Sequence, residues 1–113
     1  MGIENIELLK GTLGLLLLKA VSQGPRHGHD ILSWIREVSR DTFLVDEGAI
    51  YPALHRLQAE GLLESDWGTT ENNRRARYYR VTRKGRDRLR TELERWDRYV
   101  SAFNRLLHAP EPA

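Results

Sequence analysis

The 113-residue sequence contains no cysteine. Disulfide bonds, thiolate metal sites and a cysteine nucleophile are therefore excluded. A long hydrophobic run is also missing, because the main apolar stretch, residues 13–21, is too short to span a membrane. That stretch does not resemble a signal peptide, since the acidic Glu4 and Glu7 precede it where positive charge is expected. We therefore expect a cytoplasmic protein.

The motifs of common enzyme families are missing as well. The sequence has no glycine-rich phosphate loop, no G-x-S-x-G nucleophile elbow and no H-E-x-x-H zinc motif. His27 and His29 lie close together, but no third histidine or carboxylate cluster accompanies them, so a metal site is the weaker interpretation. We interpret them as part of a turn in which Gly28 begins a helix. Neither an enzymatic activity nor a cofactor or metal is expected.

The net charge of +2 conceals a strong local excess of positive charge. Residues 72–90, "NNRRARYYRVTRKGRDRLR", contain nine basic residues and one acidic residue. Residues 1–60 contain six basic and eight acidic residues. This asymmetry favours an anionic partner on one face, with nucleic acid as the first candidate and anionic lipid as the second.

Apolar residues at helical spacing predict three helices before the basic segment. The first covers residues 5–22 and the second covers residues 28–39. The third runs from Asp46, a favoured N-cap residue, to Gly61, a favoured residue just after a helix. The side chains expected to face the core are Ile31, Ile35 and Val38 in the second helix and Ile50, Leu54 and Leu57 in the third.

Two short strands and a fourth helix are predicted to follow. The strands, residues 62–67 and 77–82, are rich in apolar, aromatic and β-branched residues and flank a loop of turn formers. The basic side chains would therefore be held on a β-hairpin. Thr82 can cap a helix over residues 83–108, and two prolines leave residues 109–113 as a frayed tail.

Three helices followed by a β-hairpin wing form a winged helix-turn-helix. We predict a mainly α fold with a small β-hairpin, in which residues 1–82 form the winged helix-turn-helix domain and residues 83–108 form a C-terminal dimerisation helix. Apolar residues in that helix recur at alternating spacings of four and three, which is a heptad seam. The chain has no further element to cover the seam, so a homodimer is expected. The seam consists of Leu89, Leu93, Trp96, Val100, Phe103 and Leu107.

The third helix is the one that would lie in the major groove of DNA. Its polar face can reach base edges or phosphates, and the loop of the wing can reach phosphates or the minor groove. Each set taken alone also fits a simple solvated surface, but the two together favour DNA. The residues predicted to contact DNA are Tyr51, His55 and Arg56 in the helix and Asn73, Arg74, Arg75 and Arg77 in the wing.

Trp96 would face its counterpart across the dimer axis. It either packs as an ordinary hydrophobic residue or forms, with its twin, a flat slot for an aromatic ligand. The first helix is apolar nearly all round, so one side of it needs cover from a second subunit. Leu8, Leu15 and Leu18, which lie off the main apolar stripe of that helix, would form the walls of the slot.

Several stretches carry a more specific pattern: "LLKGTLGLLLLKAV", "GPRHGHDI", "EGAIYPALHRLQAEGLLES", "WG", "RRARYYRVTRKGR" and the terminal helix with its tryptophan. In these stretches the sequence resembles the PadR family of bacterial transcriptional regulators, over about residues 6–107. Its length is similar to that of the short subfamily with one C-terminal helix, which includes multidrug-sensing members. His29 departs from the family pattern, which usually has an aromatic residue there, commonly tyrosine.

The resemblance implies a homodimeric repressor that binds an inverted-repeat operator and is released by a small molecule. Family members respond to phenolic acids or to flat multidrug-type aromatics. On the matching positions, Tyr51 and its neighbours would read DNA, and Arg74 and Arg75 would grip the backbone. Trp96 matches the tryptophan that stacks on drugs in the multidrug-sensing members.

We therefore expect a sequence-specific DNA-binding transcriptional regulator. One alternative is a nonspecific or architectural nucleic-acid-binding winged-helix protein without a small-molecule ligand. Another is a protein-interaction module whose basic wing docks an acidic partner. Substitution of Tyr51 or His55 separates a regulator from a nonspecific binder. Sequence specificity would fall in a regulator and barely change in a protein that binds only the DNA backbone.

Overall fold

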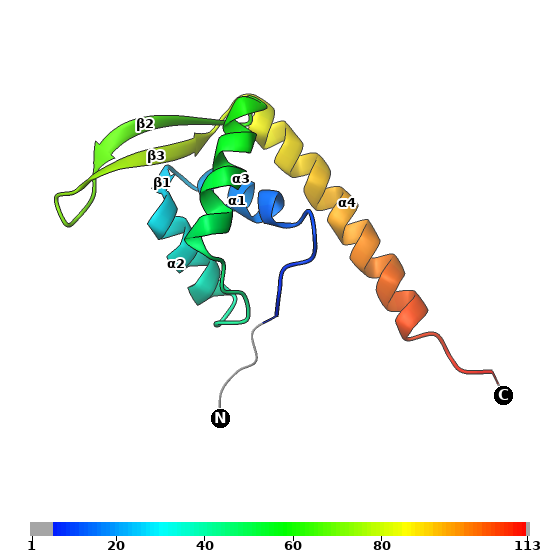
Figure 1. The fold of residues 1–113 in the computed structure, drawn as a ribbon. Coiled ribbons are helices and arrows are strands. Elements are labelled where there is room, and N and C mark those ends of the chain that lie inside the picture. Colours follow the sequence, from blue (N-terminus) through cyan, green and yellow to red (C-terminus); the bar gives the residue numbers. More distant parts are fainter. Residues whose placement is uncertain (1–5, 113) are drawn as a thin grey trace.

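The computed structural model describes residues 6–112 and has the predicted winged helix-turn-helix fold (Figure 1). Three helices pack around one core, a small sheet closes one side, and the wing and the last helix extend away from this body in opposite directions (Figure 1). The elements in chain order are α1 (Leu13–Ser22), β1 (Arg26–His27), α2 (Gly28–Val38), α3 (Glu47–Ala59), β2 (Leu63–Thr69), β3 (Arg75–Val81) and α4 (Arg83–Leu107).

The first helix is shorter than predicted. It begins at Leu13, whereas the apolar periodicity predicted a start at residue 5, which itself lies outside the described residues. Gly11 has a φ of +87°, a left-handed conformation that a right-handed helix cannot contain. The Thr12 hydroxyl donates a hydrogen bond of 2.7 Å to the carbonyl of Leu9 and closes this turn. Residues 6–12 therefore form an irregular segment before α1.

The sheet has three antiparallel strands in the order β1-β3-β2. The predicted hairpin is confirmed, with Leu63 opposite Val81 at its base and Thr69 opposite Arg75 near its tip. The third strand, β1, was not predicted. It consists of two residues only, too few to show the alternation by which a strand is recognised in a sequence.

The core lies between the three helices and the base of the sheet. Burial of each large apolar side chain contributes about 1.5–3 kcal/mol. The predicted inward residues of α3 are all buried, and so are two of the three predicted in α2. Val38 was predicted wrongly: it is the last residue of α2 and is 65% exposed. The buried side chains include Leu17, Leu18, Val21, Ile31, Ile35, Ile50, Leu54, Leu57, Leu62, Leu63 and Tyr79.

The C-terminus of α3 is closed as predicted. Gly61 adopts a φ of +79°, and its N–H donates to the carbonyl of Gln58 at 2.9 Å. The N–H of Leu62 donates to the carbonyl of Leu57 at 2.9 Å, which completes a Schellman motif. This motif turns the chain sharply from α3 into β2.

The start of α4 is fastened to the same turn. The Thr82 hydroxyl accepts the N–H of Gly85 at 3.0 Å, which confirms the predicted cap, and donates to the carbonyl of Gly61 at 2.7 Å. Gly85 is buried against the carbonyl group of Leu62, and a Cβ atom on it would collide with that oxygen and lie 2.7 Å from Cγ2 of Val81. We call the contacts among Gly61, Leu62, Thr82 and Gly85 the joint. The joint connects α3, the wing and α4.

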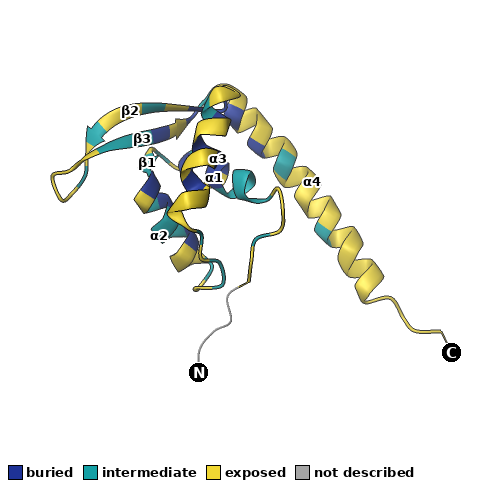
Figure 2. Ribbon diagram, viewed as in Figure 1, coloured by how far each residue is buried: buried dark blue, intermediate teal, exposed yellow. Residues whose placement is uncertain are grey.

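Beyond the joint, α4 leaves the body, and most of its surface is exposed (Figure 2). Leu89 is an exception to the predicted seam, because it is 7% exposed and belongs to the core of its own chain. It is therefore already covered without a second subunit. From Leu93 onward the seam positions are exposed or half-buried.

Substitution of Gly85 by alanine tests the joint. Alanine favours a helix by about 1 kcal/mol over glycine, but the collision with a backbone carbonyl cannot be relieved by a side-chain movement. We expect Gly85→Ala to lower the free energy of unfolding by about 1–3 kcal/mol in denaturant titrations. Gly48→Ala is the matched control, since Gly48 is also helical and a Cβ there meets nothing within 4 Å. Equal stability of the two variants would contradict the role of the joint.

Candidate nucleic-acid interface

The polar face of α3 is exposed to solvent. Ile50, Leu54 and Leu57 occupy the core side of the helix, so residues on the opposite side must point outward. Tyr51 is 38% exposed, and the side chains of His55 and Arg56 are exposed. The three residues predicted to read DNA therefore share an accessible surface.

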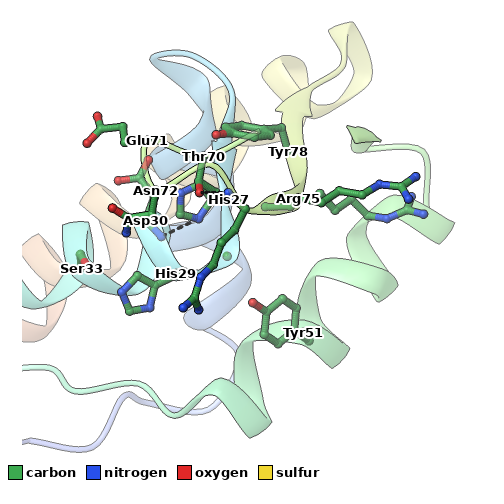
Figure 3. Close-up of a pocket in the computed structure, with 14 residues that line it drawn as sticks. His27, His29, Asp30, Ser33, Tyr51, Thr70, Glu71, Asn72, Arg75 and Tyr78 are labelled. Atoms are coloured by element: carbon green, nitrogen blue, oxygen red, sulfur yellow. Dashed lines mark hydrogen bonds between the residues drawn. The ribbon is translucent and has the colours of Figure 1, made fainter. Parts of the chain in front are cut away.

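A groove of about 750 Å³ runs between α2, α3 and the wing (Figure 3). Figure 3 shows His29 from α2 and Tyr51 from α3 bordering the same space, with Thr70 and Asn72 contributed by the wing. Four of the predicted DNA-contacting residues line this groove: Tyr51, Arg74, Arg75 and Arg77. His55, Arg56 and Asn73 are not part of its lining. The complete lining consists of residues 27–30, 33, 51, 70–72 and 74–78.

The position of Tyr51 in the groove depends on Gly28. A Cβ atom at Gly28 would lie 2.7 Å from the phenolic oxygen of Tyr51, so only glycine lets this ring approach the start of α2 so closely. The sequence indicated a helix start at Gly28, which the structure shows, but gave no sign of this contact. A buried glycine without a positive φ is the structural sign of a close approach, but it cannot be recognised from the sequence alone.

The tip of the wing is an ordered turn. Asn73 has a φ of +60°, which asparagine tolerates better than most residues, and its N–H donates to the carbonyl of Thr70 at 2.9 Å. The N–H of Arg74 donates to the hydroxyl of Thr70 at 3.2 Å. Asn73 therefore shapes the turn that presents the neighbouring arginines.

Charge is distributed unequally between the two faces of the wing. On one face, Arg80 pairs with Glu64 at 3.3 Å and with Asp66 at 2.7 Å. Hydrogen bonding to Glu64, followed by the charge of Asp66, raises the pKa of Arg80. On the other face, the guanidinium groups of Arg75 and Arg77 lie against the ring of Trp67. Within residues 6–112, neither of these two groups forms an ion pair with a carboxylate, and neither does Arg74.

Tyr79 connects this surface to the core. Its side chain is 1% exposed, and burial raises the pKa of its phenol, an effect that the nearby Arg77 opposes and Tyr51 reinforces. The wing is thus continuous with the hydrophobic core at its base and carries free charge toward its tip.

The two histidines occupy the rim of the groove. His27 and His29 are stacked with ring centroids 6.5 Å apart, and His27 meets Tyr78 edge-on at 5.3 Å. The Nδ1 atom of His27 accepts the N–H of Asp30 at 3.2 Å, so His27 caps α2. In the part of the chain that the structure describes, no group of three or more histidine, cysteine or acidic residues is arranged to hold a metal ion. No helix among the described residues is long and apolar enough to cross a membrane.

A second cavity, of about 440 Å³, lies between the segment before α1, α1 itself and α4. Three of the four residues proposed for a ligand slot line it: Leu8, Leu15 and Trp96. Leu18 does not, because it points into the core and is 2% exposed. Its place as a wall residue was therefore predicted wrongly. The remaining lining residues are Ile6, Glu7, Leu9, Thr12, Leu16, Lys19, Phe43 and Leu93.

Comparison with known proteins agrees with this geometry. Transcriptional regulator Rv3488 of Mycobacterium tuberculosis is 36% identical over 81 residues, which are 71% of this chain and 71% of that protein. A PadR-like transcriptional regulator from Bacillus cereus has a similar structure, with a TM-score of 0.79 and 29% identity over 90% of this chain and 97% of the other. A PadR family regulator from Eggerthella lenta gives a TM-score of 0.77 and 26% identity, and the match covers 89% of this chain and 86% of the other.

The description of the matching family states its function directly. The family model is that of the transcriptional regulator PadR-like family, and it matches residues 17–91, from within α1 to within α4. Proteins of this family are transcriptional regulators and not enzymes. The extent of this match, with the similarity to Rv3488, establishes that the chain belongs to the PadR-like family of transcriptional regulators.

Proposed function

We propose that this regulator binds a specific operator as a homodimer and that a small aromatic molecule between the subunits controls its release from DNA. The observation that carries the proposal is the groove of about 750 Å³, which is lined both by Tyr51 of α3 and by Arg74, Arg75 and Arg77 of the wing. A helix that reads base edges and charges that contact phosphates are the two components of specific recognition.

The division of work follows from the chemistry of the side chains. An α-helix fits the major groove of B-DNA, where each base pair has a distinct pattern of donors and acceptors. Tyr51, His55 and Arg56 supply matching donors and acceptors from the exposed face of α3. Arg74 and Arg75 lie near the tip of the wing and line the same groove as Tyr51, so they would contact the adjacent phosphates or minor groove.

The exposed side of α4 supports the homodimer. Leu93, Phe103 and Leu107 are 37%, 47% and 67% exposed in the single chain, and Trp96 is 37% exposed. Aromatic rings line the same helix, with the ring centroids of Trp96 and Tyr99 6.3 Å apart. A second copy of α4 would cover this surface, with Val100 in the middle of the contact. The twofold axis would then place two α3 helices about 34 Å apart or a multiple of that distance.

The second cavity supports control by a ligand. It opens beside Trp96 and Leu93 on the side of α4 that the second subunit would cover. Its lining is mainly aliphatic and aromatic, which suits a planar aromatic or phenolic compound. A ligand held there would change the distance between the two α3 helices. The two subunits could then no longer make their base and phosphate contacts at the same time.

A nonspecific nucleic-acid binder remains the alternative. Arg74, Arg75 and Arg77, which form no ion pair with a carboxylate within residues 6–112, would bind any duplex through its phosphates. Such a protein would lose affinity steeply with salt and would discriminate little between sequences. Measurements of DNA binding with two duplexes separate a specific regulator from a nonspecific binder.

The DNA contacts are tested by fluorescence anisotropy with DNA from upstream of the gene of this protein and with a shuffled duplex. We expect Tyr51→Phe to reduce the preference for the upstream duplex by about 1–3 kcal/mol, because it removes a hydroxyl that would hydrogen-bond to a base edge and leaves the ring that packs on Gly28. Arg74→Gln should weaken both duplexes alike and lower the slope of log K against log salt by about 1.

Arg80→Gln is the control for charge, because Arg80 is exposed but neutralised by Glu64 and Asp66 on the opposite face of the wing. It should change neither affinity nor salt slope appreciably. Equal binding of the wild-type protein to both duplexes, lost at near-physiological salt, would contradict specific recognition and favour the nonspecific alternative.

The dimer is tested by light scattering of the free protein. Phe103→Glu should convert the dimer to a monomer, because it places a charge within a contact made of apolar side chains. Arg105→Glu, on the opposite side of α4 at an exposed position, should remain dimeric. A wild-type monomer at micromolar concentration, or a Phe103→Glu dimer of unchanged stability, would disprove this interface.

The ligand slot is tested by quenching of tryptophan fluorescence with planar aromatic compounds. Quenching should fall sharply in Trp96→Ala, because Trp96 is the tryptophan that lines the second cavity. Trp34 and Trp67 also fluoresce, so the comparison with the variant is required. Quenching that is identical in the two proteins would show that Trp96 is not the ligand platform.

A further inference from the structure

We infer that Trp67 is a positioning residue of the DNA interface: its indole ring holds Arg75 and Arg77 in place on the face of the wing that carries unpaired charge. This inference rests on the proposed DNA-binding function and adds a residue to it. Trp67 is not a member of the predicted contact set and does not line the groove.

The strand register brings the three side chains together. Trp67 on β2 lies directly opposite Arg77 on β3, and Arg75 lies opposite Thr69, two residues further along. Alternate residues of a strand point to the same face, so Trp67, Arg75 and Arg77 all project from one face of the hairpin. Direct and diagonal neighbours in an antiparallel pair are close enough for long side chains to touch.

The distances are those of cation–π contacts. The Cζ atom of Arg75 lies 4.4 Å from the centroid of the Trp67 ring, and that of Arg77 lies 4.8 Å from it. Tryptophan is the most effective partner for such contacts, which extend to about 6 Å. One ring therefore contacts two guanidinium groups that would otherwise repel each other and spread apart.

A short hydrogen-bonded chain connects this cluster to the recognition helix. Arg77 donates to the Ser65 hydroxyl at 2.8 Å, and Ser65 donates to the side-chain carbonyl of Gln58 at 3.1 Å. Gln58 belongs to α3. Ser65 and Trp67 are two residues apart on β2 and therefore point to the same face. Arg77 contacts both of them, which orients its side chain relative to α3.

Trp67 also leaves the arginines available to an external anion. A carboxylate would orient a guanidinium group as well, but it would neutralise the charge, as Glu64 and Asp66 do for Arg80 on the other face. The aromatic face orients the group without cancelling its charge. Trp67 is 55% exposed, so it is not a core residue. Its contacts with the two arginines account for its place on the wing.

The test compares Trp67→Leu with Trp67→Phe. Leucine removes the aromatic face, whereas phenylalanine keeps a smaller one. In the free protein, the side-chain Nε–H resonances of Arg75 and Arg77 should lose their ring-current shift in Trp67→Leu and retain part of it in Trp67→Phe. Thermal unfolding identifies any loss of fold, and the exposure of the ring predicts that both variants remain folded.

DNA binding of the same proteins gives the functional readout. We expect Trp67→Leu to weaken binding by roughly five- to thirtyfold, the effect of losing two exposed cation–π contacts. The salt slope should fall by about 1–2, because two arginines no longer reach their phosphates together. Trp67→Phe should recover part of both effects. In a chain that already carries Arg75→Gln and Arg77→Gln, Trp67→Leu should have no further effect.

Three results would overturn the inference. One is an unchanged salt slope in Trp67→Leu. Another is a loss of affinity that persists in full without the two arginines, since Trp67 would then act on DNA directly. A third is an absence of ring-current shifts in the free wild-type protein. Failure of the proposed function would give a different result. The wild-type protein would then bind the upstream and shuffled duplexes equally. The effect of Trp67→Leu on the salt slope could still be measured on either duplex.

Discussion

The joint at the end of α3 is the contact on which the rest of the molecule depends. Gly85 packs directly on the carbonyl of Leu62, and Thr82 bonds both to Gly61 and to the first turn of α4. The end of α3, the base of the wing and the start of α4 all meet at this point. A shift of α4 at the joint would therefore alter the angle between the surface proposed for dimerisation and the surface proposed for DNA. This geometry would give a direct mechanical path between the ligand proposed near Trp96 and α3.

The wing shows how a small protein can present charge without losing order. Its base is anchored by buried Leu63, Tyr79 and Val81, which belong to the core. Toward the tip, one face pairs its arginine with carboxylates, and the other lays its arginines on an aromatic ring. The net charge of the whole chain is only +2, so the strength of the positive surface comes from this local sorting and not from bulk composition.

Features with a local physical cause were predictable from the sequence. Gly61 and Thr82 mark helix ends because the backbone there needs a left-handed residue and a hydroxyl cap. The outward face of α3 followed from helical periodicity, and the hairpin followed from β-branched and aromatic residues on each side of a turn. The residues proposed to contact DNA therefore lie on exposed or groove-lining surfaces, although their contacts with DNA remain a prediction.

Features that depend on distant contacts were not predictable. The start of α1 was wrong because the periodicity continued through Gly11, although the backbone there is left-handed and the N–H of Ile6 bonds to the distant carbonyl of Thr42. Leu18 fitted the pattern of a second apolar face on α1, and Leu89 fitted the heptad seam of α4. Both are buried in the core, where α1 packs against α4 and the sheet. Gly28 makes its close contact with Tyr51, which is 23 residues away in the sequence. Trp67 contacts Arg75 and Arg77, which are 8 and 10 residues away. No local spacing signals such pairs.

The central claim is that two copies of the surface formed by α3 and the wing bind DNA together. Hydroxyl-radical footprinting on the tightest-binding duplex from a random pool tests it most directly. We expect two equivalent sets of protected sugars, related by a twofold axis and centred about one helical turn (roughly 34 Å) or a multiple of it apart. A single protected region, or uniform weak protection along the whole duplex, would contradict it.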